Sequence, residues 1–404
     1  MKYINKKLTI EKINFQKIAN KFGTPSYCYS YSKLRENIIN FKKNFKSFSP
    51  LICFAVKSNT NLSLIREIKK FGLGADVVSV GELMIALKAG INPNKIVFSG
   101  VGKKNYEISF AIEKKILLIN AESLSEVKEI NKIAKLKKKI VSVGVRLNPN
   151  TDAKTLSQIS TGKKENKFGV NRNNFYEIIK YCKNSKNINL ICLSVHIGSQ
   201  ILDHKPYEIM LKAVNQVLSK TDHKFEFIDL GGGMGITYSN KNKKLNYKKY
   251  NTAISKFLKK NKVKIIFEPG RSIIGDTGTL LSKVIYIKDN EKKKFIILDA
   301  AMNDLMRPAL YGSYHKTLPV IKSNKVSNKT YEFVGPICES TDKFVTLKKF
   351  QVLEEKDLIA ICDVGAYGMS LSSNYNLRTK PIELLIRGSK IKVIRKRQKL
   401  KDLI

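Results

Sequence analysis

Tryptophan is absent from this chain of 404 residues, histidine occurs only four times, and 33 acidic residues stand against 75 lysines and arginines. The cysteines form no CxxC pair, and no histidine accompanies them at the spacing of zinc ligands. We therefore predict neither a disulfide framework nor a metal site. The six cysteines are Cys28, Cys53, Cys182, Cys192, Cys338 and Cys362.

Long hydrophobic runs are also missing. No apolar stretch approaches the ~20 residues that a membrane-spanning helix needs. The N-terminal residues Met1 to Lys7 lead into an alternating polar and apolar segment without the apolar core of a signal peptide. We therefore expect a soluble, cytoplasmic protein without a membrane partner.

The formal net charge of +42 favours contact with polyanions, because lysine and arginine neutralise phosphate groups. The lysines are spread along helix-like segments and loops, for example at 42–43, 137–139 and 292–294. The aromatic-interleaved basic motifs of nucleic-acid-binding modules are absent. We expect non-specific association with polyanions at low salt and no specific nucleic-acid partner.

The length and the 43% hydrophobic content suit one large domain and one smaller domain. From residue 33, helical periodicity alternates with short apolar runs. Eight strand-then-helix units predict an α/β fold, a (β/α)₈ barrel of the TIM type. A doubly wound open sheet accepts the same alternation, but it does not bring the first and last strands together. The candidate strands are 51–57, 75–79, 96–99, 116–119, 140–147, 190–196, 225–230 and 263–268.

After about residue 276 the pattern changes to short β-type runs with few long helices. We predict a β-rich C-terminal domain that also takes in the N-terminal segment up to about Tyr29. The predicted domains are a barrel over 30–276 and a β-rich domain formed by 1–29 and 277–404.

Reactive residue types gather at the predicted C-terminal strand ends, where the active sites of such barrels lie. Burial of Lys57 at a strand end disfavours its charge, and the neutral amine can form a Schiff base with an aldehyde. Taken alone, Lys57 is better explained as a side chain that extends from a strand end into water. The residues at these ends are Lys57, Asp76, Arg146, His196, Gly231, Gly232, Gly233 and Glu268.

Three glycines, Gly231 to Gly233, follow an apolar strand directly. Their backbone amides can converge on a phosphate, and strand seven is the usual phosphate corner of such barrels. By itself the run also fits a tight or flexible turn. Ser199 stands close enough to His196 in sequence to share its site.

Glu268 and Arg271 flank a rigid Pro-Gly turn. In a pyridoxal phosphate site, a carboxylate that faces the ring nitrogen keeps it protonated, and the protonated ring stabilises a carbanion. The guanidinium of Arg271 can hold a carboxylate through its planar fork of donors. Without the other elements, this turn is equally explained as a salt-bridged loop.

These motifs, with further blocks, resemble the alanine racemase-like, fold-type III pyridoxal phosphate enzymes and, among them, the diaminopimelate decarboxylase family. The resemblance runs from Gly23 to Glu383, so it covers nearly the whole chain. Its one minor departure is Ser58, where family members often have alanine. The matching blocks are 55–59, 74–79, 167–169, 196–200, 229–236, 268–271, 299–311, 335–342 and 365–369.

The resemblance implies a role for each matching residue. Lys57 forms the Schiff base with pyridoxal 5'-phosphate, His196 stacks on the ring, and Glu268 pairs with its nitrogen. Ser199, Gly231 to Gly233 and Gly270 surround the phosphate, while Asp76 and Arg146 join the cofactor site from their strand ends. Arg271, Arg307 and Tyr311 bind the distal carboxylate of the substrate, Glu339 faces its distal ammonium, and Tyr367 lies near the cofactor. Cys338 is the proton donor, contributed by the second subunit of a homodimer with shared active sites.

The reaction implied is decarboxylation of meso-2,6-diaminopimelate to L-lysine, the last step of lysine biosynthesis. Diaminopimelate has a second carboxylate, which the amino acids ornithine, arginine and lysine lack. Arg271 and Arg307 can bind this carboxylate. The nearest alternative is a related decarboxylase of another basic amino acid or of carboxynorspermidine. An alanine racemase, a non-catalytic pyridoxal phosphate carrier and a nucleic-acid binder are weaker alternatives, and an inert buried thiol is the alternative for Cys338.

Overall fold

The computed structural model describes residues 1–153, 155–239 and 244–404. The chain divides into two compact units. The sheet unit comprises Met1–Asn37, Thr237–Asn242 and Ile274–Ile404, and the barrel unit comprises Ile38–Ile236 and Lys243–Ile273. The predicted division at residues 30 and 276 stays a prediction.

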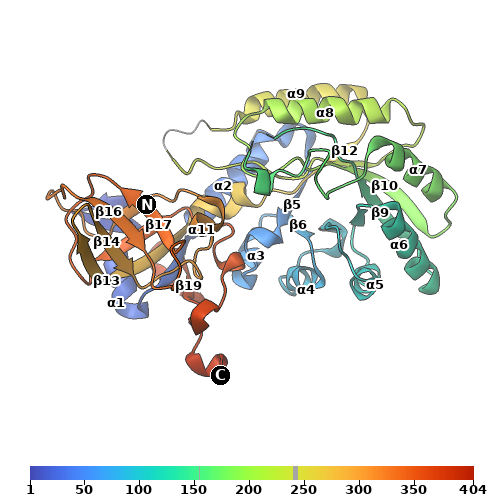
Figure 1. Ribbon diagram of the computed structural model, residues 1–404. Helices are drawn as coiled ribbons and strands as arrows, with labels where there is room; N and C mark the ends of the chain where they lie inside the picture. The colour runs from blue at the N-terminus through green and yellow to red at the C-terminus, as the bar shows by residue number, and fades with distance from the viewer. Residues whose placement is uncertain (154, 240–243) are drawn as a thin grey trace. The chain divides into compact units, whose positions relative to one another are not determined.

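Eight parallel strands close into a barrel, which confirms the predicted fold class (Figure 1). Closure joins the first strand to the last, because β12 pairs with β5 through Ile266 and Leu51. The strands follow one another around the barrel in sequence order. They are β5 (Leu51–Ala55), β6 (Gly74–Val77), β7 (Ile96–Phe98), β8 (Leu118–Ala121), β9 (Val141–Arg146), β10 (Ile188–Ser194), β11 (Phe227–Asp229) and β12 (Lys264–Phe267).

The strands of the barrel are apolar runs because both of their faces are covered. Cys53, Val97, Leu118, Cys192 and Ile266 fill part of the interior, and each is fully buried. Burying one such aliphatic side chain contributes ~1.5–3 kcal/mol, so these strands are held in place strongly. Two acidic residues interrupt this apolar pattern.

Those two residues are Asp76 in β6 and Asp229 at the end of β11, and both are fully buried. A buried carboxyl is costly unless hydrogen bonds or charges compensate for it. The two residues therefore indicate compensating polar contacts near the carboxyl ends of the strands.

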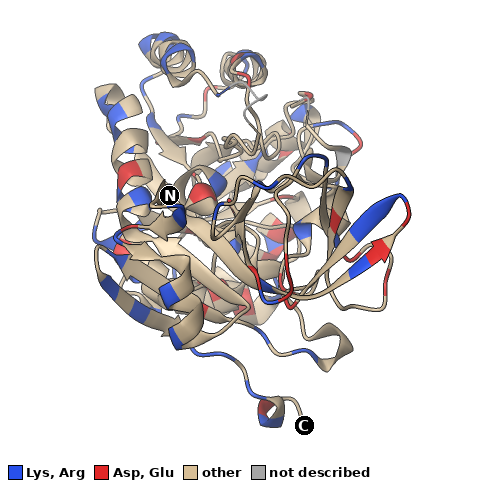
Figure 2. Cartoon of the chain, turned by 90° about the vertical axis from the view of Figure 1, so that its left-hand side faces the viewer, with Lys and Arg blue, Asp and Glu red and all other residues tan. Residues whose placement is uncertain are grey.

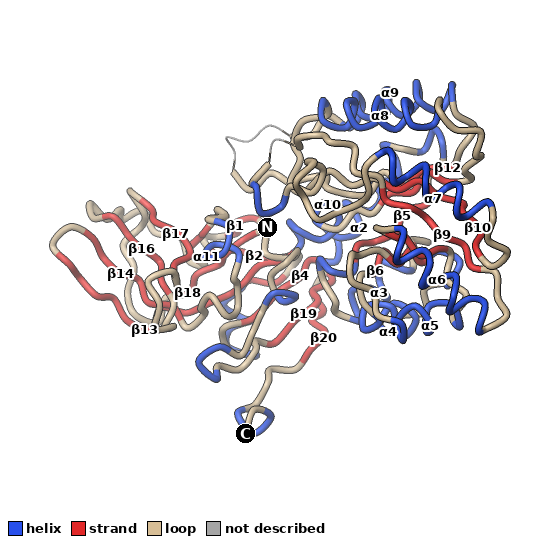
Figure 3. The backbone as a smooth tube through the Cα atoms, turned by 45° about the vertical axis from the view of Figure 1, so that its right-hand side comes forward, coloured by secondary structure: helices blue, strands red, loops and turns tan. Residues whose placement is uncertain are grey.

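Helices surround the strands (Figure 3). In α6 the residues Val127, Ile130, Ile133 and Ala134 are buried at helical spacing, and the Ser123 side chain caps the first turn. The helices that belong wholly to the barrel unit are α3 (Leu62–Lys69), α4 (Val80–Lys88), α5 (Asn105–Glu113), α6 (Leu124–Leu136), α7 (Arg172–Lys183), α8 (Lys205–Leu218) and α9 (Tyr247–Lys260). The unit boundary falls within α2 (Tyr31–Asn44) and within α10 (Arg271–Ile274).

The sheet unit contains the β-rich fold that the sequence predicts. Strand β4 (Ser26–Ser30) lies between β13 (Gly278–Asn290) and β19 (Ile382–Arg387), so the N-terminal segment joins the C-terminal sheet as predicted. The other strands of this sheet are β14 (Lys293–Leu298), β15 (Thr317–Pro319), β16 (Thr330–Val334), β17 (Lys343–Leu347), β18 (Leu358–Cys362) and β20 (Lys390–Arg395). Strands β15, β17 and β20 were not predicted from the sequence.

A small antiparallel sheet and two helices complete this unit. Leu8, Ile10, Phe15 and Ile18 of the N-terminal segment pack with Leu281 of β13 in one buried cluster. This packing ties the start of the chain to the C-terminal sheet. The small sheet contains β1 (Lys2–Ile4), β2 (Lys7–Ile10) and β3 (Ile13–Asn14), and the helices are α1 (Phe15–Phe22) and α11 (Arg307–Tyr311).

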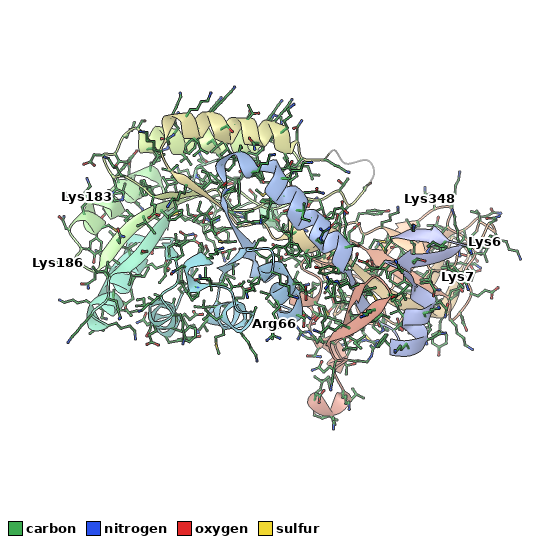
Figure 4. All side chains as sticks on the ribbon, turned by 180° about the vertical axis from the view of Figure 1, so that it is seen from behind. Lys6, Lys7, Arg66, Lys183, Lys186 and Lys348 are labelled. Atoms are coloured by element: carbon green, nitrogen blue, oxygen red, sulfur yellow. The ribbon has the colours of Figure 1, made fainter. Side chains whose placement is uncertain are left out.

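Basic residues occupy helices, strands and loops in both units (Figure 2). Figure 4 labels six of the exposed ones, with Lys183, Lys186 and Arg66 in the barrel unit and Lys6, Lys7 and Lys348 in the sheet unit. A groove of about 850 Å³ runs between α8 and α9 of the barrel unit, away from the strand ends. Among the helices described, none is both long and apolar enough to span a bilayer.

Candidate active site

Lys57 lies in a short turn directly after β5. Its Nζ is 2.6 Å from Oδ2 of Asp76, which belongs to the neighbouring strand β6. The Asp76 side chain is fully buried, whereas that of Lys57 is 37% exposed. An opposite charge at this distance favours the ammonium form of Lys57, so the ion pair opposes the effect of burial on which the sequence argument relied.

His196 follows β10 and lies beside the glycine loop. The Gly232 amide donates to Nδ1 of His196 at 3.2 Å, so Nδ1 carries no proton. Burial, followed by the cations of Arg146 and Lys57, holds the pKa of His196 well below its usual value. The imidazole is therefore neutral and presents an uncharged aromatic face.

Arg146 ends β9 and is almost fully buried. Its guanidinium donates to Oε1 of Glu122 and to the carbonyl oxygen of His196, at 3.2 and 3.3 Å. It also lies 4.8 Å from the centre of the Phe168 ring. These contacts fix the segment that carries His196.

The glycine loop leaves no room for side chains. A Cβ on Gly232 would lie 2.1 Å from the carbonyl oxygen of Glu268, and a Cβ on Gly233 would lie 2.3 Å from that of Gly198. Gly233 also has a φ of +85°, which L-residues rarely adopt. Backbone amides can therefore approach a ligand closely here.

Three further predicted residues, Ser199, Gly270 and Arg271, lie at these strand ends. Arg271 Nη2 donates to Oγ of Ser199 at 3.2 Å. A Cβ on Gly270 would lie 2.9 Å from the Cβ of Ser58, so Gly270 packs against the turn that carries Lys57. The strand ends thus bring together an amine, a neutral imidazole, a hydroxyl, a guanidinium and a bare backbone.

Glu268 follows β12 and is 7% exposed. Its Oε1 accepts a hydrogen bond from Oγ of Ser99 at 3.4 Å. Burial raises the pKa of Glu268 well above its usual value, and the negative charges of Asp229 and Asp76 raise it further. Burial likewise raises the pKa of Asp229, to about 6.

No role was predicted from the sequence for Asp229, for Asn120 or for Ser99. Asn120 Nδ2 lies 3.1 Å from Oδ2 of Asp229 and 3.3 Å from Oγ of Ser99. The available signal was an acidic residue at the end of an apolar strand, immediately before the glycine loop. Buried acidic residues of that kind need partners, so they mark polar networks.

Arg307 and Tyr311 belong to α11 in the sheet unit, where Arg307 is buried. The Arg307 guanidinium contacts His315 at 2.8 Å and Ser313 at 3.2 Å, and it lies 4.6 Å from the centre of the Tyr238 ring. His315 and Tyr238 were also missed in the sequence. Their partners are set by the fold and not by spacing within α11.

Cys338 and Glu339 lie in an exposed loop of the sheet unit. Glu339 accepts hydrogen bonds from the hydroxyls of Tyr375 and Thr341, and these bonds lower the pKa of its carboxyl. Asp342 organises the loop by accepting from the Ile337 and Met302 amides, each at 2.7 Å. The loop therefore holds a thiol and a carboxylate at the surface.

Tyr367 has a φ of +58°, in the left-handed region that non-glycine residues seldom occupy. It lies between Ala366 and Gly368, both buried. A strained backbone position of this kind costs ~1–3 kcal/mol and often accompanies a functional role. The role predicted for Tyr367 stays a prediction, as do those of the other site residues.

Comparison with known proteins gives concordant matches. Residues 31–275 match the family model of the pyridoxal-dependent decarboxylase, pyridoxal binding domain. The chain is 40% identical over 401 residues to a diaminopimelate decarboxylase of Neisseria meningitidis serogroup B, covering 98% of this chain and 95% of the relative. It is 41% identical over 393 residues to a diaminopimelate decarboxylase of Helicobacter pylori strain J99, covering 96% and 97%.

Solved structures agree with these matches. The crystal structure of a diaminopimelate decarboxylase from Helicobacter pylori, complexed with L-lysine, superposes with a TM-score of 0.93 at 41% identity, covering 96% of this chain and 98% of the other. A lysine/ornithine decarboxylase from Vibrio vulnificus, complexed with putrescine, has a TM-score of 0.80 at 18% identity and covers 93% of this chain and 97% of the other. At that identity the second likeness concerns the fold alone.

Proposed function

Because the chain belongs to the diaminopimelate decarboxylase family of pyridoxal-dependent decarboxylases, we propose that it converts meso-2,6-diaminopimelate to L-lysine and carbon dioxide. It is a carboxy-lyase. The observation that carries the proposal is the Lys57 ammonium, 2.6 Å from the buried Asp76 at the carboxyl ends of the barrel strands. The Lys57 amine is thus fixed by an ion pair at the end of the barrel where such enzymes place their reactive groups.

The residues present fit pyridoxal 5'-phosphate as the cofactor. An amine is available for its aldehyde, a buried carboxyl for its ring nitrogen, and a glycine loop without side chains for its phosphate. When bound, pyridoxal phosphate supplies the electron sink that takes up the electron pair left when carbon dioxide departs. Each of these features belongs to the barrel unit.

In the proposed mechanism, the protein binds and orients the reacting groups. Lys57 binds the cofactor covalently, and Asp76 holds the Lys57 ammonium when it is free. His196 packs a neutral ring against the cofactor, since a charged imidazole would lower the proton affinity of the nearby lysine and ring nitrogen. Ser199 and the glycine loop bind the phosphate, and Glu268 holds the proton at the ring nitrogen.

The roles proposed for Arg307, Tyr311 and Glu339 concern the far end of the substrate. Arg307 binds its distal carboxylate with Tyr311, and Glu339 binds its distal ammonium. The Arg307 guanidinium is fixed by His315, Ser313 and Tyr238, so little side-chain entropy is lost on binding. For Arg271 and Tyr367 we propose the roles that the family resemblance implies, namely binding of the distal carboxylate by Arg271 and contact with the cofactor by Tyr367.

We also propose a homodimer in which Cys338 and Glu339 complete the site of the partner subunit. The exposed position of their loop supports this assignment, because a thiol that protonates an α-carbon must reach substrate. The same unit also exposes the apolar side chains of Leu310, Tyr314, Tyr375 and Leu377. Cytoplasmic localisation stays a prediction.

A substrate panel tests the proposed function. Purified protein loaded with pyridoxal phosphate is assayed for carbon dioxide release from meso-2,6-diaminopimelate, lysine, ornithine, arginine and carboxynorspermidine. We expect diaminopimelate to have by far the highest kcat/KM, with L-lysine as the product. Faster turnover of ornithine or carboxynorspermidine would replace the proposal by a related decarboxylase.

A further inference from the structure

Glu122 follows β8 directly and has none of the roles assigned above. Its side chain is only 3% exposed. A carboxylate so deeply buried is costly unless charges and hydrogen bonds compensate for it. Both of its oxygens have such partners, since Oε1 accepts from Nη1 of Arg146 at 3.2 Å and Oε2 accepts from the Gly169 amide at 2.9 Å. Glu122 therefore joins the end of β9 to the segment that precedes α7.

The two contacts fix the guanidinium of Arg146. Its Nη2 donates to the carbonyl oxygen of His196 at 3.3 Å, and its carbon lies 4.8 Å from the centre of the Phe168 ring. Glu122 holds the guanidinium directly, and through the Gly169 amide it also holds the neighbour of the ring that packs against it. Because the donors of a guanidinium lie in one plane, these partners determine its orientation.

The backbone brings the Gly169 amide to Glu122. The Val170 amide donates to the carbonyl oxygen of Arg146 at 2.8 Å, and the Asn148 amide donates to that of Val170 at 2.8 Å. Gly169 has a φ of +68°, and a Cβ there would lie 2.9 Å from the Arg146 carbonyl oxygen. The segment therefore runs beside the end of β9 with no room for a side chain at Gly169.

Glu122 is held in turn by two further charged residues. Its amide donates to Oε2 of Glu126 at 2.8 Å, and Oε1 of Glu126 accepts from Nζ of Lys103 at 2.6 Å. The Lys103 side chain is 1% exposed, and its Nζ also donates to two backbone carbonyls. Lys103, Glu126, Glu122 and Arg146 thus form a row in which the charges alternate in sign. The backbone of Glu122 is fixed, so its carboxylate is a rigid support for Arg146.

We propose that Glu122 is a positioning residue for the cofactor, acting through the Arg146 guanidinium. This inference rests on the proposed function for the identity of the cofactor and for the place of Arg146 and His196 in its site. A guanidinium that is already oriented loses little side-chain entropy when a ligand binds, so the ligand binds more tightly and in one orientation. Without Glu122, binding of the cofactor must also order Arg146.

A purely structural role for Glu122 leads to a different expectation. Removing one partner of a buried ion pair destabilises a fold, so a lower melting temperature is expected in either case. The affinity for the cofactor and the orientation of the bound cofactor separate the two roles, provided that both are measured well below the melting temperature. A residue that supports only the fold leaves both unchanged there.

The first test compares Glu122→Gln with wild type. Glutamine keeps the volume of the side chain but has no charge and one acceptor oxygen in place of two. We expect the dissociation constant of pyridoxal phosphate to rise about tenfold or more, as for the loss of a hydrogen bond to a charged group. The visible circular dichroism of the bound cofactor at saturation should also change, because the cofactor no longer has a single orientation.

Glu226→Gln is the matched control. Glu226 is a half-exposed glutamate of the barrel unit whose Oε1 lies 3.0 Å from Nζ of Lys264. Its replacement should leave the dissociation constant and the circular dichroism unchanged. If Glu122→Gln lowers the melting temperature but keeps the dissociation constant and the circular dichroism of wild type, Glu122 supports only the fold and the proposal is overturned.

A double-mutant cycle tests the route through Arg146. Arg146→Met alone should raise the dissociation constant. Adding Glu122→Gln to Arg146→Met should then change it by less than about twofold, because the guanidinium to be oriented is gone. A second tenfold rise would show that Glu122 acts independently of Arg146. If Arg146→Met does not fold, Glu122→Gln alone still decides whether Glu122 acts on the cofactor.

These readouts do not involve the substrate. Absence of diaminopimelate turnover would overturn the proposed activity and leave the binding results intact. A wild-type protein that binds no pyridoxal phosphate would overturn the cofactor assignment together with the role of Glu122.

Discussion

Nη1 of Arg307 lies 2.8 Å from Nε2 of His315, and Nδ1 of the same imidazole lies 2.8 Å from the carbonyl oxygen of Cys362. A guanidinium only donates and a carbonyl only accepts, so the Nδ1 nitrogen carries the proton and Nε2 accepts. His315 is therefore a neutral relay that ties Arg307 to strand β18. Tyr238 packs edge-on against the imidazole, with ring centres 5.3 Å apart, and fixes it from one side.

Replacing His315 by leucine should weaken the binding of the substrate and leave cofactor binding intact. Loss of a hydrogen bond to a charged group costs ~1.5–3 kcal/mol, which corresponds to a ten- to hundred-fold rise in KM for diaminopimelate. His315→Gln, which retains an acceptor and a donor, should recover much of the loss. An unchanged KM in His315→Leu would show that Arg307 needs no orientation by His315.

Lys57→Ala should abolish the borohydride-reducible link between protein and cofactor without unfolding the chain. The reason is that Lys57 alone is assigned the covalent bond, and its side chain is partly exposed at the strand end. Circular dichroism checks the fold, and peptide mapping of reduced wild-type protein locates the label. Label on another lysine would contradict the assignment of the site.

Arg307→Met and Glu339→Gln should impair turnover of diaminopimelate much more than binding of the cofactor. Losing the buried Arg307 charge from a desolvated pocket costs ~2–5 kcal/mol, so kcat/KM should fall by a factor of tens to thousands. We expect a fall of at least tenfold for Glu339→Gln, since a neutral amide attracts the substrate ammonium less strongly. The exposed Glu291 of the same unit offers a control, Glu291→Gln, which should be silent. Loss of the cofactor spectrum in either test variant would place that residue in the cofactor site instead.

Mixing Lys57→Ala with Cys338→Ala chains should restore activity if the active sites are shared between subunits. Each variant alone should be nearly inactive. After random reassortment about half of the dimers are mixed, and each has one intact site of two, so about a quarter of wild-type activity should return. Mass measurement verifies the exchange of subunits. A mixture that stays inactive after exchange would place Cys338 in the site of its own chain or in no site.

The barrel was predictable because buried parallel strands are continuous apolar runs, and these runs end where polar residues begin. For this reason the sequence was enough to place Lys57, His196 and Glu268 at strand ends. The ion pair between Lys57 and Asp76 could not be predicted from the sequence, because it depends on the strand register that places Ala55 beside Asp76. Burial of the Lys57 amine was therefore predicted without the Asp76 charge that opposes its effect.

The contacts of Asp229 could not be predicted from the sequence either. Its partners Asn120 and Ser194 come from β8 and β10, and the three side chains meet only inside the closed barrel. His315 was missed for a similar reason, since its second partner, Cys362, belongs to a strand far along the chain. Side-chain networks that join distant strands have no local signature, whereas amphipathic helices and buried strands do.

The pairing of β12 with β5 has a consequence for how the protein is made. The Ala55 amide donates to the Pro269 carbonyl at 3.1 Å, so the segment that carries Lys57 receives its last backbone neighbour from the turn after the final barrel strand. During synthesis, the lysine leaves the ribosome long before that neighbour exists. The emerging chain can form local helices and hairpins early, but the pocket around Lys57 must await translation of the whole barrel and a contact between its two ends. Truncated chains that lack β12 should therefore be unable to capture the cofactor during translation.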